Sequence, residues 1–511
     1  MKKKAFLLNA VILTATSLLA RAMGIAFRVY MSNKIGAEGI GLYQLIGTVY
    51  LFCANFATTG ISITVTRLVT DSVANKKFTK AKRYTRYCLL LSVFISCAVG
   101  VLLFCYADLI GTQFLHDART VLSLKVLAPS LPFMAVSSTY RGYFYANRQV
   151  FKTASEQLIE QVVEIIVFAA VVGVMAPKGL SYACCSIVVG TTAAEVLSCV
   201  YSFIMYRIGL PQPQKDDGPS RGMIKKIASI AIPITGSYCL RSGLSMIENV
   251  LIPSGLKKAG ASSQRSLAAY GMIMGMVMPV ITFPSVFLYS FSMLLIPEMS
   301  EANAVGNKNN IHHVATRVFQ IAGLFSIMVA GIFFFFGGDL GYIIYGNREP
   351  GIYIKVLAPI VPLMYLDSVV DGMLKGLGEQ VHYLSYNIID STLRVILIYF
   401  LLPIKGIEGL LIVMFVSTIL NSSLSMGRLI KVTKMNLDVK NWIIKPVVSI
   451  VSSCLLFHFI LTKTAALFSS FAAASFFGIT TAVIFYFLFL FFTKGISKED
   501  VIWFKSCLSR K

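Results

Sequence analysis

The chain has 511 residues, of which 56% are hydrophobic and only 14% are charged, and its mean hydropathy is +0.74. These values exclude an ordinary soluble domain, in which about a quarter of the residues are charged, and they exclude intrinsic disorder. The 46 Lys and Arg outnumber the 23 Asp and Glu, so the formal net charge is +23. Apolarity combined with excess positive charge predicts a polytopic membrane protein and argues against a nucleic-acid-binding domain, which has no use for long charge-free runs.

Fourteen stretches of the chain are long and apolar enough to cross a bilayer, which takes about 20 residues. The connections between them are too short for a soluble domain. The sequence therefore predicts an all-α polytopic fold of about 14 transmembrane helices. The expected spans are residues 5–33, 40–69, 86–106, 123–146, 154–175, 180–206, 225–252, 266–297, 313–337, 353–376, 383–403, 407–430, 443–462 and 466–493.

The distribution of the basic residues predicts the topology. With the N-terminus in the cytoplasm, 29 of the 46 Lys and Arg fall in cytoplasmic segments, 11 in outer loops and six within spans. Because Lys and Arg are enriched in cytoplasmic loops, we expect both termini in the cytoplasm. The first span resembles a signal peptide, but its apolar character continues past Arg21 to Tyr30, so we expect it to be retained. The basic stretch from Lys76 to Arg83 is interpreted as a loop that faces anionic lipid.

A ten-residue segment, Lys125–Met134, recurs 230 residues later as Lys355–Met364 with seven identical positions. Gly142 and Gly372 keep the same offset. The repeat predicts two six-helix lobes related by a pseudo-two-fold axis, followed by two extra helices, and such repeats are typical of alternating-access transporters. The expected divisions are an N-terminal lobe at 1–210, a cytoplasmic linker at 211–224, a second lobe at 225–435, an extra helix pair at 440–495 and a cytoplasmic tail at 496–511.

Two prolines in each copy of this segment lie inside an expected span. A proline frees a backbone carbonyl and permits a bend, which a rocking transporter can use as a hinge. The alternative is that these prolines only shape the packing of the helices. The four candidates are Pro129, Pro132, Pro359 and Pro362.

Four arginines, Arg21, Arg28, Arg67 and Arg241, fall inside expected spans one, two and seven. A charge in the membrane core costs at least about 2.5–3.5 kcal/mol, so each needs a partner or a water-filled cavity. Because guanidinium binds phosphate through two parallel hydrogen bonds, arginines that face a central cavity suit an anionic substrate. For Arg67 the alternative is an interfacial side chain, and for the other three it is an ion pair within the protein.

Expected span five carries Glu156, Glu160 and Glu164, whose spacing places three carboxylates on one helix face. We interpret Glu160 and Glu164 as cavity residues that face a polar headgroup or a proton, or that balance the arginines. For Glu156 the alternative to a cavity role is a solvated side chain at the helix end, and we favour that alternative.

The second half of the chain holds a different set of oxygen-bearing residues. Glu248, Asn387, Asp390 and Thr418 are candidate ligands for a hard coupling cation such as Na+. The alternative for Asp390 is an ion pair with Arg394, one helical turn later.

Enzymatic motifs are missing from the sequence. The five histidines are scattered, no phosphate-binding loop occurs, and no CxxC pair is found among the ten cysteines. We therefore expect no enzymatic activity, no catalytic residue, no cofactor and no firm metal site, although Na+ or H+ coupling remains open.

The segments Lys3–Leu7, Ala20–Val29 and Ile35–Tyr43 resemble the opening of stage V sporulation protein B-like proteins. These are polysaccharide-biosynthesis-type members of the multidrug/oligosaccharidyl-lipid/polysaccharide (MOP) exporter superfamily, are similar to MurJ lipid II flippases and share a MATE-like architecture. The resemblance implies two lobes around a V-shaped cavity, with the last two helices shaping a groove for a lipid tail. It implies that Arg21 and Arg28 match cavity arginines of the family, and that Arg67 and Arg241 match by position.

The resemblance also implies a function. We expect flipping of an undecaprenyl-pyrophosphate-linked saccharide, such as a peptidoglycan or polysaccharide precursor, across the plasma membrane of a bacterium. The expected partners are this lipid-linked glycan and membrane lipids, with no nucleic acid, and we expect a monomer. The alternatives are a cation-coupled multidrug exporter of the same superfamily, a membrane glycosyl polymerase and a cell-wall scaffold.

Overall fold

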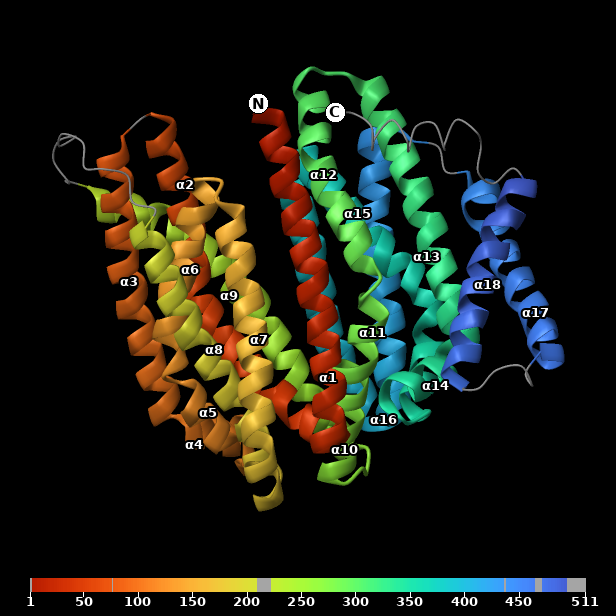
Figure 1. The fold of residues 1–511 in the computed structure, drawn as a ribbon, viewed down its shortest axis with the longest axis horizontal. Helices are drawn as coiled ribbons and strands as arrows, with labels where there is room; N and C mark the ends of the chain where they lie inside the picture. The colour runs from red at the N-terminus through yellow and green to blue at the C-terminus, as the bar shows by residue number, and fades with distance from the viewer. Residues whose placement is uncertain (1, 76, 209–221, 436–437, 465–470, 494–511) are drawn as a thin grey trace. The chain divides into compact units, whose positions relative to one another are not determined.

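The computed structural model describes residues 2–75, 77–208, 222–435, 438–464 and 471–493 (Figure 1). The expected tail at 496–511, and all but the last three residues of the expected linker at 211–224, lie outside these ranges. Every regular element in the described part of the chain is helical, which confirms the all-α fold class.

The chain divides by packing into two compact units, one that ends at Gly275 and one that begins at Met276. The division at residues 211–224 was expected from the repeat and stays a prediction. The first unit contains α1 (Lys2–Ala54), α2 (Gly60–Ala74), α3 (Phe78–Cys105), α4 (Ala107–Leu109), α5 (Val121–Leu127), α6 (Ser130–Ala146), α7 (Val150–Met175), α8 (Leu180–Ile208), α9 (Met223–Lys258) and α10 (Ser263–Tyr270). The second contains α11 (Met278–Thr282), α12 (Ser285–Ala304), α13 (Lys308–Tyr345), α14 (Glu349–Leu357), α15 (Val361–Gly376), α16 (Gln380–Thr433), α17 (Lys445–Thr464) and α18 (Phe471–Phe492).

Two of the helices are each interrupted by one glycine. Gly36 breaks α1 with φ 69° and Gly406 breaks α16 with φ 57°, a backbone conformation that favours glycine. Each break separates two of the spans expected from the sequence. By length and composition alone, the described residues contain ten helices that can cross a membrane, or eleven if α5 and α6 form one bent span. The expected count of fourteen is therefore not confirmed.

The internal repeat reappears as a repeated hydrogen bond. The Ser62 hydroxyl donates to the Ser138 carbonyl at 2.8 Å, and the Ser292 hydroxyl donates to the Ser368 carbonyl at 3.2 Å. Both residues of the second pair lie 230 positions after those of the first. The bond joins α2 to α6 in one unit and α12 to α15 in the other, so the repeat extends to how helices pack.

The repeat also extends to the backbone. His116 and Arg148 are two of the three non-glycine residues with positive φ in the described chain, at 54° and 58°. Gly346 and Gly378 stand 230 residues later with φ of 68° and 82°. A left-handed residue thus ends a helix at matching places in the two copies, although glycine occupies it in one copy only.

Both copies of the proline-containing segment break a helix. The axes of the pieces before and after Pro129 differ by 49°. In the second copy a 3-10 turn, Ala358–Ile360, contains Pro359 and separates α14 from α15. Pro132 and Pro362 lie in the first turn of the helices that follow. The bends are present as expected, and their use as hinges stays a prediction.

The last two helices pack side by side in the second unit (Figure 1). Ile450 and Phe457 of α17 and Tyr486 of α18 form a buried cluster with Leu324 of α13. The Tyr486 hydroxyl donates to the Leu324 carbonyl at 2.8 Å, so a polar group within this apolar cluster has a partner. The extra pair is thereby fixed to α13.

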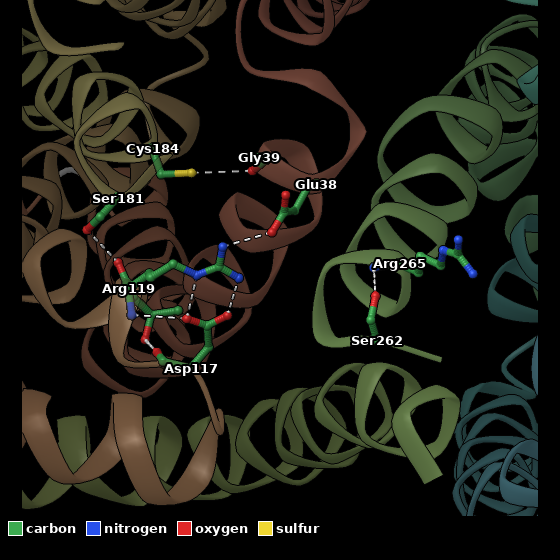
Figure 2. Close-up of polar contacts among 9 residues, drawn as sticks. Glu38, Gly39, Asp117, Arg119, Ser181, Cys184, Ser262 and Arg265 are labelled. Atoms are coloured by element: carbon green, nitrogen blue, oxygen red, sulfur yellow. Dashed lines mark hydrogen bonds and ion pairs between the residues drawn. The ribbon is translucent and has the colours of Figure 1, made fainter. Parts of the chain in front are cut away.

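The segment after the Gly36 break is held by an ion-pair network (Figure 2). Arg119 pairs with Glu38 at 2.8 Å and with Asp117 at 2.7 Å, and its carbonyl accepts from Ser181 of α8. Burial raises the pKa of Asp117, but the hydrogen bonds and the charge of Arg119 lower it further, to below its usual value. The network ties the second half of α1 to the start of α8.

Gly41 lies at a close crossing of α1 and α10. A Cβ atom at this position would overlap the carbonyl oxygen of Leu267 and lie 3.2 Å from the Gly271 nitrogen. We expect Gly41→Ala to lower the free energy of unfolding by about 1–3 kcal/mol, the usual cost of overpacking. The measurement is thermal unfolding of purified protein in detergent. Gly47→Ala is the matched control, because Gly47 lies in the same helix with open space around it. An equal loss in both variants would contradict the prediction.

Candidate functional site

The first half of α1 packs on α7 through small and aromatic residues. A Cβ on Gly24 would lie 3.8 Å from the Gln161 side-chain oxygen, so the helices approach closely there. The rings of Phe27 and Tyr30 contact Phe168 at centroid distances of 5.3 and 5.6 Å. This contact brings the arginine-bearing helix alongside the helix that carries the three glutamates.

Glu164 of α7 has hydrogen-bond partners on α8 and on α7 itself. Its carboxylate accepts hydrogen bonds from Thr191 of α8 at 2.8 Å and from Gln161 at 3.3 Å. The charge of Arg28 also acts on this carboxylate. Arg28 forms no hydrogen bond or ion pair with Glu164, so the ion-pair alternative for Arg28 stays a prediction.

Glu156 is fully buried, which differs from the solvated helix end suggested by its place in the sequence. Its Oε1 accepts a hydrogen bond from Ser198 at 2.8 Å and lies 3.6 Å from the Arg141 guanidinium. Arg141 also lies 3.8 Å from Glu160. Arg141, which sequence reasoning assigned no role, is thus the cation next to two of the three glutamates.

Glu195 of α8 is a fourth carboxylate in this cluster that the sequence did not reveal. Glu195 is 3% exposed. Among the neighbouring charges, those of Glu160 and Arg141 act on it most strongly. A single acid in an apolar helix gives no periodic pattern, so only the packing of α8 on α7 brings it into view. We name Arg141, Glu156, Glu160, Glu164 and Glu195 the acid cluster.

The other candidate arginines differ from Arg28. Arg21, Arg67 and Arg241 have exposed side chains and form no hydrogen bond or ion pair with the described part of the chain. They lie on α1, α2 and α9, and α9 contacts both other helices. Arg241 lies about 27 Å from the start of its helix at 1.5 Å per residue, and Arg67 lies about 10 Å before the end of its helix.

The candidate coupling-ion residues are distributed over both units. Glu248 is buried in the first unit on α9. In the second unit the Asp390 carboxylate accepts from the Ser417 hydroxyl and lies 3.4 Å from Arg394. The Asn387 amide donates to the carbonyl of Tyr383 in its own helix. Asp390 thus has the ion pair that was its alternative, and its hydroxyl partner is the neighbour of Thr418.

A second acid in this unit, Asp367, has one oxygen without a hydrogen-bond partner. The Asn421 amide donates to Asp367 Oδ2 at 3.0 Å. Asp367 Oδ1 and the side-chain oxygen of Asn421 are buried without a hydrogen-bond partner. No group of three or more His, Cys, Asp and Glu that suits a metal ion occurs in the described ranges. The Asp367–Asn421 pair was not among the residues selected from the sequence, because 54 positions separate its members.

The described helices and their repeat define a multi-pass membrane protein, and solved structures show the same fold. The lipid II flippase MurJ in its inward closed conformation matches with a TM-score of 0.67, at 14% identity over 94% of this chain and 99% of that one. An inward-facing multidrug resistance MATE family transporter of the MOP superfamily matches with a TM-score of 0.65, at 15% identity over 84% of this chain and all of that one. The described part of the chain therefore has the fold of these membrane proteins.

The particular family follows from sequence comparison. The model of the polysaccharide biosynthesis protein family matches residues 6–303, and the chain belongs to that family. Stage V sporulation protein B of Bacillus subtilis (strain 168) is 25% identical over 86% of this chain and 87% of its own length. Lipid II flippase MurJ of the same organism is 22% identical over 78% of this chain and 77% of its own length. These findings confirm the expected relationship and a multi-pass bacterial membrane protein, and the cytoplasmic position of both termini stays a prediction.

Proposed function

We propose that the protein flips an undecaprenyl-pyrophosphate-linked saccharide from the cytoplasmic to the outer leaflet of a bacterial plasma membrane by alternating access. The family is named for polysaccharide biosynthesis, and one relative is named a lipid II flippase. The substrate is released chemically unchanged, so the protein acts as a transporter and not as an enzyme. Both termini lie in the cytoplasm, and one copy of the chain is sufficient.

The observation that carries this proposal is the set of three arginines without a partner on apolar helices. Arg21, Arg67 and Arg241 are exposed and form no ion pair with described residues. An unpaired charge at membrane depth costs several kcal/mol, so such residues are retained where a ligand or water meets them. Pyrophosphate offers oxygens on two phosphorus atoms, and guanidinium binds them through paired, charge-assisted hydrogen bonds.

The mechanism follows from differential binding in two conformations. The pyrophosphate enters from the cytoplasm and is held by Arg21, Arg67 and Arg241 of the first unit, with Arg28 nearby, while the polyprenyl tail remains in lipid. Glu160 and Glu164 line the cavity beside the headgroup. Rocking of the lobes at the breaks near Pro129 and Pro359 exposes the site to the outside. A coupling ion favours one conformation only if it binds that conformation more tightly.

The direct test is flipping by purified protein in liposomes. A fluorescent undecaprenyl-pyrophosphate disaccharide is placed in both leaflets, and an impermeant hydrolase then cuts the outer sugars. We expect continued loss of inner-leaflet substrate in protein-containing liposomes and a plateau near half in empty ones. A zwitterionic phospholipid with the same reporter is the control for scrambling.

Three results would contradict the proposal. Equal transfer of the phospholipid would show non-selective scrambling. Transport of cationic drugs with no transfer of the pyrophosphate lipid would favour the multidrug-exporter alternative. Longer glycans in the product would indicate a polymerase, which the proposal excludes.

A further inference from the structure

The acid cluster holds more negative charge than its cations balance. Four glutamates lie in it with one arginine, Arg141, and the charge of Arg28 reaches Glu164 from α1. If every glutamate were ionised, four negative charges would face two positive charges. An uncompensated buried carboxylate costs several kcal/mol, which is more than the cost of taking up a proton.

Within the cluster the hydrogen bonds and ion pairs are unevenly shared. Glu156 has Ser198 and Arg141, and Glu164 has Thr191 and Gln161. Glu195 has no hydrogen bond and no ion pair with the described chain, and its Oε2 is buried without a partner. An ionised carboxylate needs such partners, whereas a protonated one needs far fewer. Of the four glutamates, Glu195 has the fewest partners for a negative charge. Protonation of Glu195 therefore removes the least compensated charge in the cluster.

Charged and titratable groups act on Glu195 from α1, α6 and α7 and from α8 itself. Glu160 of α7 acts on it most strongly, followed by Arg141 of α6 and then the two outer glutamates of α7. Among the described residues these groups are Glu156, Glu160 and Glu164 from α7, Arg141 from α6, Tyr50 from α1 and Cys199 from α8. Arg141 is shared with Glu156 and Glu160, so its charge does not balance Glu195 alone.

Glu160 differs from its neighbours because part of its side chain is accessible. Its side chain is 29% exposed, while Glu156 has no exposure and the Glu195 residue has 3%. Its Oε2 is buried and lies 3.8 Å from Arg141, so only another part of the side chain is accessible, and its charge acts on Glu195. Glu160 can therefore exchange a proton with the surroundings and with the interior of the unit.

We propose that the Glu195 carboxyl is a proton-binding site inside the first unit, with Glu160 as the group through which the proton enters and leaves. The proton moves as H+ from Glu160 to a Glu195 oxygen, and no bond other than O–H forms or breaks. The site needs only residues of the first unit, so it does not depend on which substrate is carried. Its ligand is a proton, and it is distinct from the cation-ligand candidates Glu248, Asn387, Asp390 and Thr418.

Infrared spectroscopy of the purified full-length protein tests the site without any substrate. A protonated carboxyl has a C=O stretch that is separate from the carboxylate bands. We expect wild-type protein at neutral pH to show an absorption in this region that Glu195→Gln reduces by about one carboxyl. Glu408→Gln is the matched control, since Glu408 is exposed on α16 in the second unit, outside the acid cluster. If the spectra of Glu195→Gln and wild type are the same in this region, the assignment of the proton to Glu195 is wrong.

Two further variants separate the assignment from a folding defect. Glu195→Asp keeps a carboxyl and should retain the band at a shifted frequency. In heavy water, Glu160→Gln should slow the deuterium shift of the Glu195 band at least severalfold while its intensity remains. An unchanged exchange rate in Glu160→Gln would remove Glu160 from the pathway, and loss of the band in Glu195→Asp would overturn the site.

Discussion

Replacing Arg141 with methionine is expected to destabilise the protein by about 3–4 kcal/mol at neutral pH. Arg141 lies 3.6 Å from Glu156, which is fully buried and has Ser198 as its other partner. Removing one member of a buried ion pair leaves the other charge uncompensated, at a typical cost of about 3–5 kcal/mol. Protonating an ordinary glutamate at pH 7 costs about 4 kcal/mol, which limits the penalty from one carboxylate. The measurement is the thermal unfolding midpoint in detergent.

The second variant in this test is the double replacement Arg141→Met with Glu156→Gln. A neutral amide at position 156 needs no cation, so most of the lost stability should return. Acidification should likewise restore the single variant, because proton uptake by Glu156 removes the same charge. Equal destabilisation in the single and double variants would show that Arg141 acts through packing and not through charge.

Replacing both Arg21 and Arg28 with alanine is expected to abolish flipping in liposomes. A hydrogen bond to a charged group contributes about 1.5–3 kcal/mol, which corresponds to a loss of about 10- to 150-fold for each arginine. Arg21 has no partner among the described residues, so its replacement should not affect stability. The charge of Arg28 also acts on Glu164, so part of its effect should appear as lower stability. The rate of substrate transfer and the unfolding midpoint are measured together.

One lysine variant, Arg21→Lys, and one alanine variant outside the proposed site, Arg265→Ala, complete this experiment. Arg21→Lys keeps the charge but loses the paired hydrogen bonds, so we expect an intermediate rate. Arg265→Ala should flip at the wild-type rate, because Arg265 is an exposed arginine on α10 outside the proposed site. Flipping that survives in the double alanine variant, or complementation of a flippase-depleted strain by it, would refute the role proposed for these arginines.

Local sequence features predicted much of the fold but only part of the candidate site. The spacing of Glu156, Glu160 and Glu164 was sufficient to place three carboxylates on one helix face, because helical geometry is local. The deep burial of Glu156 was not predictable, because it depends on Ser198 and Arg141 from other helices. Glu195 carries no local pattern, so its place beside α7 could not be derived from spacing.

The same distinction applies to the backbone. The glycines at positions 36 and 406 stand between apolar stretches, where a break was expected. By contrast, nothing in the identities of His116 and Arg148 indicates the left-handed backbone that they share with Gly346 and Gly378. Residues other than glycine take this conformation uncommonly, so the local sequence alone does not predict it at a given position.

The sequence by itself determined that the chain enters the membrane, that it does so as helices, and that its two halves repeat. These properties follow from the length of apolar stretches and from the need of every backbone group in lipid to bond within its own segment. The tertiary structure alone decided which charges are balanced. Arg141 is shared by Glu156 and Glu160, while Arg21 remains without a partner in the described chain. The reason is that charges separated along the chain interact only where helices pack, and their distance and exposure set the strength of that interaction.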